Sequence, residues 1–158
     1  IGLITLAGIY YKVYEAGYKA TVTMYYGRDT LEKMENLGKD QPKYNLSQGE
    51  TRHIDSDIFT LQGNKITMQL YESGIDGQSW IAKGISENAT LTEGGHVDNY
   101  VTGEIKSANV GSGSCLMAYE STDKIIRYIK INYTIREDLS FTDVQVSSWY
   151  NNSWEKLL

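Results

Sequence analysis

Short strand-like segments, in which apolar and polar residues alternate, recur along most of the chain. In Ile66–Leu70 every second residue is apolar, and the segment is followed by Tyr71, Glu72, Ser73 and Gly74. A period of two is typical of a strand with one buried face, and turn residues between such segments indicate antiparallel connections. The pattern predicts an all-β fold.

Three of these segments end in the same way. Tyr25, Tyr71 and Tyr119 each close an apolar run and are followed by a small or polar residue. Their interval is roughly 45 to 50 residues, a spacing that signals a repeated supersecondary unit. We therefore expect one all-β domain over residues 1–158, an antiparallel Greek-key β-sandwich of repeated units at about 20–68, 66–118 and 115–158.

Helical periodicity is confined to one place. Leu31, Met34 and Leu37 have helical spacing, and Gly38 would end such a helix. The sequence thus predicts at most one short helix, near residues 30–38.

The aromatic and turn residues resemble the motif of the βγ-crystallin family. Tyr71-Glu72 with Gly77 matches the opening of that motif, and Asp98-Asn99 followed by Thr102 matches its closing segment, with Gly103 where the family has Ser. The resemblance implies paired Greek-key units that bind Ca²⁺ through the closing segment. A second closing segment, Phe141–Ser148, has Asp143 followed by Val144 and lacks the Asn/Asp pair.

One short segment concentrates metal-ligating side chains. If residues 53–58 are extended, His53, Asp55 and Asp57 lie on one face, and Ile54 and Ile58 lie on the other. An imidazole and two carboxylates could bind a divalent cation, with Ca²⁺ or Mg²⁺ favoured by oxygen ligands and Zn²⁺ by the imidazole. The same alternation also fits a half-buried strand with its polar side chains in water.

Aromatic side chains gather near the end of the sequence. Trp149, Tyr150 and Trp154 lie among polar residues and could form a platform for a sugar ring or a partner. Trp80 could contribute, but an aromatic residue in a two-layer β-fold usually fills the core, and we expect that position for Trp80.

Composition excludes some classes of function. The net charge is −5 and the 15 Lys and Arg residues are scattered, which argues against a nucleic-acid partner. No apolar run approaches the ~20 residues of a membrane span. The chain starts without Met at an apolar stretch, Ile1–Ile9, and has four glycosylation sequons, at Asn45, Asn88, Asn132 and Asn151. These features fit a processed chain that is secreted or displayed at the cell surface, or a numbering that begins inside a larger protein.

The sequence therefore favours a non-catalytic binding or structural β-domain, as a module of an assembly, an adhesin or a toxin. One alternative is a carbohydrate-binding β-sandwich that uses the C-terminal aromatics, and another is a small metal-dependent hydrolase centred on His53. No cofactor is expected other than Ca²⁺. The expected partner is carbohydrate or a second copy of the chain, because the opening stretch, Ile1–Tyr14, reads as a strand in need of a neighbour.

Overall fold

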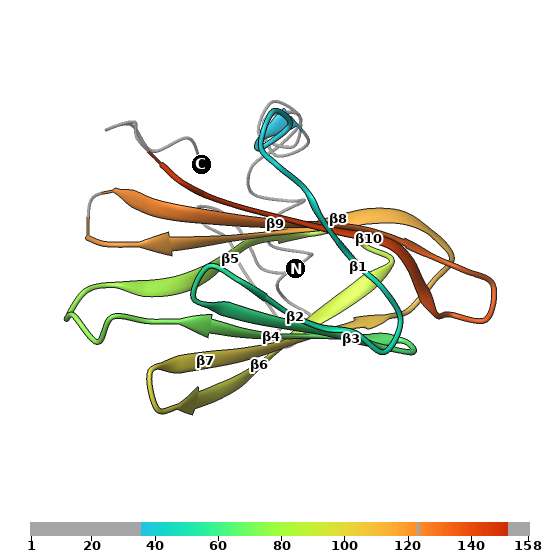
Figure 1. Ribbon diagram of the computed structural model, residues 1–158, viewed down its shortest axis with the longest axis horizontal. Helices are drawn as coiled ribbons and strands as arrows, with labels where there is room; N and C mark the ends of the chain where they lie inside the picture. The colour runs from blue at the N-terminus through green and yellow to red at the C-terminus, as the bar shows by residue number, and fades with distance from the viewer. Residues whose placement is uncertain (1–35, 123, 152–158) are drawn as a thin grey trace, which may run out of the picture.

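The computed structural model describes residues 36–122 and 124–151, and this part of the chain consists of antiparallel strands joined by turns (Figure 1). In chain order the strands are β1 (Tyr44–Leu46), β2 (Thr51–Ile54), β3 (Asp57–Gln62), β4 (Lys65–Tyr71), β5 (Ser79–Ile85), β6 (Ala89–Val97), β7 (Tyr100–Ser107), β8 (Gly111–Glu120), β9 (Ile125–Ile135) and β10 (Phe141–Tyr150).

The strands form two five-stranded sheets that pack face to face. Sheet A has the order β1-β10-β9-β8-β5, and sheet B has the order β2-β3-β4-β7-β6. In Figure 1 the orange and red strands β9 and β10 of sheet A lie above the green and olive strands of sheet B. This arrangement confirms the predicted all-β antiparallel sandwich.

The alternation of side chains explains why these segments are strands. In β4 the side chains of Ile66, Met68 and Leu70 are at most 1% exposed, whereas Lys65, Gln69 and Tyr71, which alternate with them on the other face, are exposed. The inward side chains of both sheets form one continuous buried cluster. Burial of this apolar surface is the main force that holds the two sheets together.

The chain passes between the sheets four times, and two of these passages are short corners that join edge strands. Residues 47–50 lead from β1 to β2, and residues 86–88 lead from β5 to β6. At the second corner the amide of Ser86 still bonds Ser114 of sheet A at 3.0 Å, while Ala89 is already in register with Ser107 of sheet B. Each corner thus joins an edge strand of sheet A directly to an edge strand of sheet B.

Four ladders contain a shift in register, and two of these shifts involve the edge strands β5 and β6. The pairing of β5 with β8 shifts between Ala82 and Gly84, and that of β6 with β7 shifts between Glu93 and Gly95. Each shift is a β-bulge that leaves one residue without a partner across the ladder.

The Greek-key order and the repeated units stay predictions. Tyr25 and the stretch Ile1–Tyr14 lie outside the described residues, as does the first part of the predicted helix at 30–38; residues 36–39 form a turn. Tyr71 ends β4 of sheet B and is 37% exposed, whereas Tyr119 lies in β8 of sheet A and is 6% exposed. The unit boundaries at 66–68 and 115–118 fall inside β4 and β8.

Candidate functional site

The outward faces of the two sheets differ. On sheet A, the outward side chains of Leu116, Ala118 and Tyr128 are buried in a second apolar cluster, against which Leu37 and Trp149 pack. On sheet B, the outward side chains of Thr51, Gln69 and Thr92 are among those exposed, and no outward side chain of that sheet belongs to either buried cluster. Among the described residues, sheet B therefore presents the open sheet face.

Cross-strand rows of polar side chains cover this open face. One row crosses all five strands in register, and the next row lies two residues away on β2, β3, β4 and β7 and three residues away on the bulged β6. The first row is Thr51, Thr60, Thr67, Glu104 and Thr92; the second is His53, Ile58, Gln69 and Thr102, followed by Gly95. Neighbouring strands lie ~4.8 Å apart, so the rows form an array in which most side chains carry a hydrogen-bonding group.

A pair of tyrosines closes the array at one end. Tyr71 of β4 is in register with Tyr100 of β7, and Val97 of β6 lies beside Tyr100. The two rings meet edge to face with centroids 6.0 Å apart. Because Tyr71 is 37% exposed and Val97 is 62% exposed, this end offers an accessible apolar surface next to polar groups.

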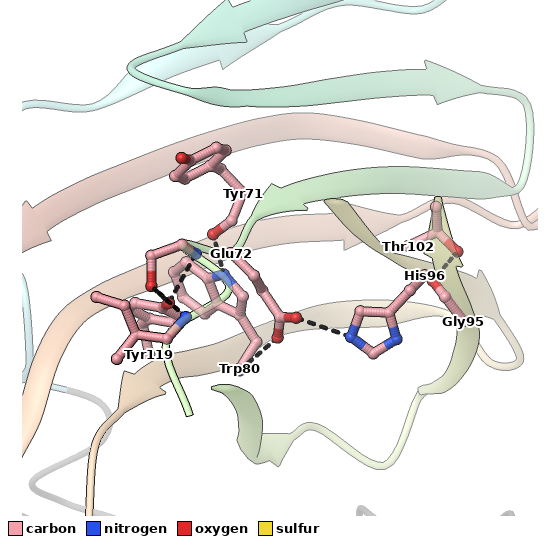
Figure 2. Close-up of polar contacts among 9 residues, drawn as sticks. Tyr71, Glu72, Trp80, Gly95, His96, Thr102 and Tyr119 are labelled. Carbon is pink, nitrogen blue, oxygen red and sulfur yellow. Dashed lines mark hydrogen bonds and ion pairs between the residues drawn. The ribbon is translucent and has the colours of Figure 1, made fainter. Parts of the chain in front are cut away.

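A hydrogen-bonded network behind the tyrosines holds this end in place (Figure 2). The Glu72 carboxylate lies 2.7 Å from Nε2 of His96 and accepts the amide N–H of Trp80 at 3.2 Å. The indole N–H of Trp80 donates to the carbonyl of Tyr71 at 2.8 Å, and the Glu72 amide donates to the carbonyl of Asn99 at 2.8 Å. These bonds tie the end of β4 to β5 and to the β6–β7 hairpin, so the tyrosine pair has a rigid base.

The loop between β4 and β5 is fixed by the other sheet. The hydroxyl of Tyr119 in β8 accepts the amide N–H of Ser73 at 2.9 Å and lies 2.8 Å from the Ser73 hydroxyl. Ser73 Oγ in turn donates to Gln78 at 3.0 Å. The Tyr119 ring also packs on the ring of Trp80, with centroids 5.2 Å apart. Trp80 is 6% exposed and fills the core, as expected.

His53, Asp55 and Asp57, the residues of the predicted metal site, do not lie on one face of a strand. Asp55 and Ser56 make the turn between β2 and β3, with φ at +54° for Asp55, so residues 53–58 are not one strand. Ile54 is in register with Asp57, and both side chains are buried, whereas His53 is exposed on the open face. The hairpin thus places His53 and Asp57 on opposite faces of sheet B, and Asp57 is not a solvated strand residue either.

Asp57 instead pairs with Arg127 across the two sheets. Nη2 of Arg127 donates to Oδ2 of Asp57 at 2.6 Å and to Oγ of Ser148 at 3.0 Å, and the amide N–H of Tyr71 donates to Oδ1 of Asp57 at 2.8 Å. Burial raises the pKa of the Asp57 carboxyl, and the hydrogen bonds from Arg127 and Tyr71 oppose that rise. This pair is part of the framework and is inaccessible to a ligand.

The predicted aromatic platform is also divided. Trp149 stacks on Tyr128 at 5.2 Å on the outward face of sheet A, whereas Tyr150, 62% exposed, lies 5.4 Å from the guanidinium of Arg127 on the other face. Trp154 lies outside the described residues. Trp149 and Tyr150 therefore cannot bind one ligand together.

The segments that resemble the βγ-crystallin motif lie close together. Asp98 and Asn99 form the turn between β6 and β7, with φ at +55° for Asp98, and Asn99 is bonded to Glu72 as described above. Within residues 36–122 and 124–151, no group of three or more His, Cys, Asp or Glu side chains is placed to hold a metal ion. Calcium binding stays a prediction.

Two hollows in the described part of the molecule are weaker candidates for a ligand site than the open face. An apolar cavity of about 30 Å³ between the sheets is lined by Met68, Trp80 and Met117 among others, and it has room for about one water. A polar hollow of about 400 Å³ lies beside β1 and the start of β10, where the Gln48 amide is already bonded to the carbonyls of Gly63 and Phe141.

The sequence did not predict the polar rows on sheet B, although the alternation in β4 indicates part of one face. Thr67, Gln69 and Tyr71 alternate with the apolar residues of β4, so their common outward face follows from the strand period. Which strands lie beside β4 depends on pairing between distant segments, and the sequence alone does not give it.

Comparison with known proteins yields no relative: no protein-family model, no curated protein and no solved structure matches this chain. In the described ranges, no helix has the length and apolar character needed to cross a membrane.

Proposed function

We propose that this chain is a non-catalytic binding module that presents the open face of sheet B to a carbohydrate, and that it acts in a secreted or surface-displayed protein. The observation that carries the proposal is the combination of in-register threonine and glutamine side chains with an exposed tyrosine pair at their end. Sugars are bound by hydroxyl and amide groups that exchange hydrogen bonds with them and by aromatic rings that cover their apolar faces.

The low charge of the face supports an uncharged ligand. Its central rows carry Glu104 as the one acidic side chain, and Glu104 lies 3.7 Å from Lys65. A nucleic acid would require clustered basic side chains, and an apolar protein partner would require a larger apolar surface than Ile58 and the group of Val97, Tyr71 and Tyr100 at one end of the face. A neutral polyhydroxylated ligand matches both the charge and the hydrogen-bonding groups of this face.

The non-catalytic part of the proposal has its own support. The described residues whose pKa is raised are Asp57, Cys115, Tyr128 and Tyr133, and all four side chains are buried. None of them lies on the open face. Perturbed groups in an accessible cleft are typical of catalysis, whereas these groups belong to the framework.

The test is binding of the purified chain to a panel of neutral and acidic polysaccharides, measured by retardation in gels that contain the polysaccharide. We expect retardation by at least one neutral polysaccharide, and its loss in Tyr71→Ala and Tyr100→Ala. Tyr150→Ala removes another exposed ring, one from sheet A, and serves as the matched control that keeps binding. No retardation by any polysaccharide would refute the proposal, as would unchanged retardation in both sheet B variants with their melting temperatures intact.

A further inference from the structure

We infer that the ligand is a linear neutral polysaccharide that lies along β4 and β7 rather than across the strands of sheet B. This inference rests on the proposed carbohydrate-binding function and specifies which part of the open face does the binding.

The first argument is the order of side chains along these two strands. β4 and β7 are in register from Lys65 and Lys106 to Tyr71 and Tyr100 without a bulge. Their outward side chains form three successive pairs, called here the β4–β7 track: Tyr71 with Tyr100, Gln69 with Thr102, and Thr67 with Glu104. At ~3.4 Å per residue, the track is about 14 Å long.

The chemistry of the track suits a chain of sugar rings. The tyrosine pair at one end provides the apolar surface against which a ring can stack. The next two pairs provide an amide, two hydroxyls and a carboxylate, which accept from and donate to sugar hydroxyls. Lys65 lies 3.7 Å from Glu104 and offsets its charge, so Lys106, in register with Lys65, leaves one excess positive charge next to the track. A polyanion would require a cluster of such charges, so the track favours a neutral ligand.

The second argument comes from the threonine row that crosses the sheet. The hydroxyls of Thr51 and Thr60 lie 3.0 Å apart and bond each other, so part of their capacity for a ligand is already used. This row also contains no aromatic side chain. Thr102 of the track likewise donates to the carbonyl of Gly95 at 3.2 Å, so the two directions differ in the aromatic ring that is available for stacking and not in the number of free hydroxyls.

The experiment compares substitutions on and off the track. Oligosaccharides of increasing length with β-1,4-linked glucose, mannose or xylose backbones are titrated into the chain by calorimetry, beside a branched polymer and a polyuronate. Gln69→Ala and Thr102→Ala remove side chains of the track. Thr51→Ala and Thr92→Ala remove exposed side chains of the threonine row that crosses the sheet, called here the crossing row. Melting curves verify that all four variants are folded.

We expect the track variants to bind about fivefold more weakly, the loss that corresponds to one hydrogen bond of ~1 kcal/mol. The crossing-row variants should bind within about twofold of the parent chain, and affinity should rise with oligosaccharide length until the ligand spans about 14 Å.

Other outcomes would overturn the inference in distinguishable ways. Loss of binding in Thr51→Ala and Thr92→Ala with none in Gln69→Ala would place the ligand across the strands. Preference for the polyuronate would exclude a neutral ligand, and equal binding of the branched polymer would exclude a linear one. All three results would leave the carbohydrate-binding function standing. Binding of no saccharide would refute both proposals.

Discussion

Asp57 and Arg127 join the two sheets through a buried ion pair, with Nη2 and Oδ2 2.6 Å apart and both side chains at most 6% exposed. Asp57 begins β3 and Arg127 belongs to β9, so the pair connects the ends of two strands that share no ladder. The Arg127 guanidinium also lies 5.2 Å from the ring of Trp80. The pair therefore fixes the relative position of the sheets at the end that carries the tyrosine pair.

The first prediction concerns this ion pair. Asp57→Asn removes the carboxylate and leaves the Arg127 charge buried, which is expected to lower the free energy of unfolding by ~3–5 kcal/mol in a urea titration. The matched control is Lys65→Ala, which breaks the exposed pair with Glu104 and should cost at most about 1 kcal/mol. Equal losses in the free energy of unfolding for the two substitutions would show that the buried pair of Asp57 stabilises the fold no more than the exposed pair does.

The second prediction concerns the hydroxyl of Tyr128, which is buried without a hydrogen-bond partner among the described residues. Tyr128→Phe keeps the ring that stacks on Trp149 and removes the unsatisfied group, so it should leave stability unchanged or raise it by about 1 kcal/mol. Tyr133→Phe is the control, because the Tyr133 hydroxyl donates to Asn88 at 3.3 Å and its loss should destabilise the fold by about 1 kcal/mol. Urea titrations of both variants measure the difference, and the opposite order would contradict this account.

The third prediction is the alkaline limit of stability. Burial, followed by repulsion from Glu120, raises the pKa of Tyr128 to about 12 from its ordinary value of 10. The folded state holds the Tyr128 proton more tightly than the unfolded state does. The contribution of the protonated hydroxyl to the free energy of unfolding is therefore complete below pH 10 and is lost as the pH rises toward 12. Urea titrations from pH 8 to pH 12 should show this loss, and Tyr128→Phe should reduce its slope. An identical slope in the variant would rule out Tyr128 as a source.

The fourth prediction concerns the contact between Gly38 and Trp149. A Cβ atom at Gly38 would lie 2.4 Å from Cη2 of Trp149, and φ at this residue is +77°. Gly38→Ala should therefore lower the melting temperature by more than Gly49→Ala, which has φ at +81° but no atom within 4 Å of the added Cβ. Gly49→Ala isolates the backbone strain, of about 1 kcal/mol, from the displacement of Trp149. A near-ultraviolet circular dichroism spectrum should change in Gly38→Ala alone.

The fifth prediction concerns Cys115, which is 1% exposed within β8. Burial raises the pKa of its thiol to about 12, so the reactive thiolate is scarce in the folded protein at neutral pH. A disulfide reagent such as Ellman's should label Cys115 only as fast as the chain opens, and labelling should become rapid in urea. Fast labelling in native buffer would show that β8 opens locally.

The sequence predicted the strands better than it predicted their partners. The alternation of Ile66, Met68 and Leu70 marks β4 with its buried face, and the apolar neighbours of Cys115 indicate a buried strand position, where the structure places it. The register of β4 with β7, on which the open face depends, is set by packing between segments about 30 to 40 residues apart and has no local signature.

Two groups of residues that were expected to lie together are separated in the structure, for different physical reasons. A continuous strand would bring His53 and Asp57 to one face, but Asp55 and Ser56 form a turn. Asp and Ser are typical turn residues, so this run of polar residues between Ile54 and Ile58 also fits a hairpin. Trp149 and Tyr150 are adjacent in β10, and the period of two alone sends them to opposite faces of sheet A.

The irregular edges of both sheets have a consequence for crowded conditions. Fibrils grow when a straight, unprotected strand recruits the same strand from another molecule. Here β5 and β6 are interrupted by bulges, and β1 and β2 are only 3 and 4 residues long. We therefore expect these four edge strands to resist pairing with another molecule when the protein is concentrated.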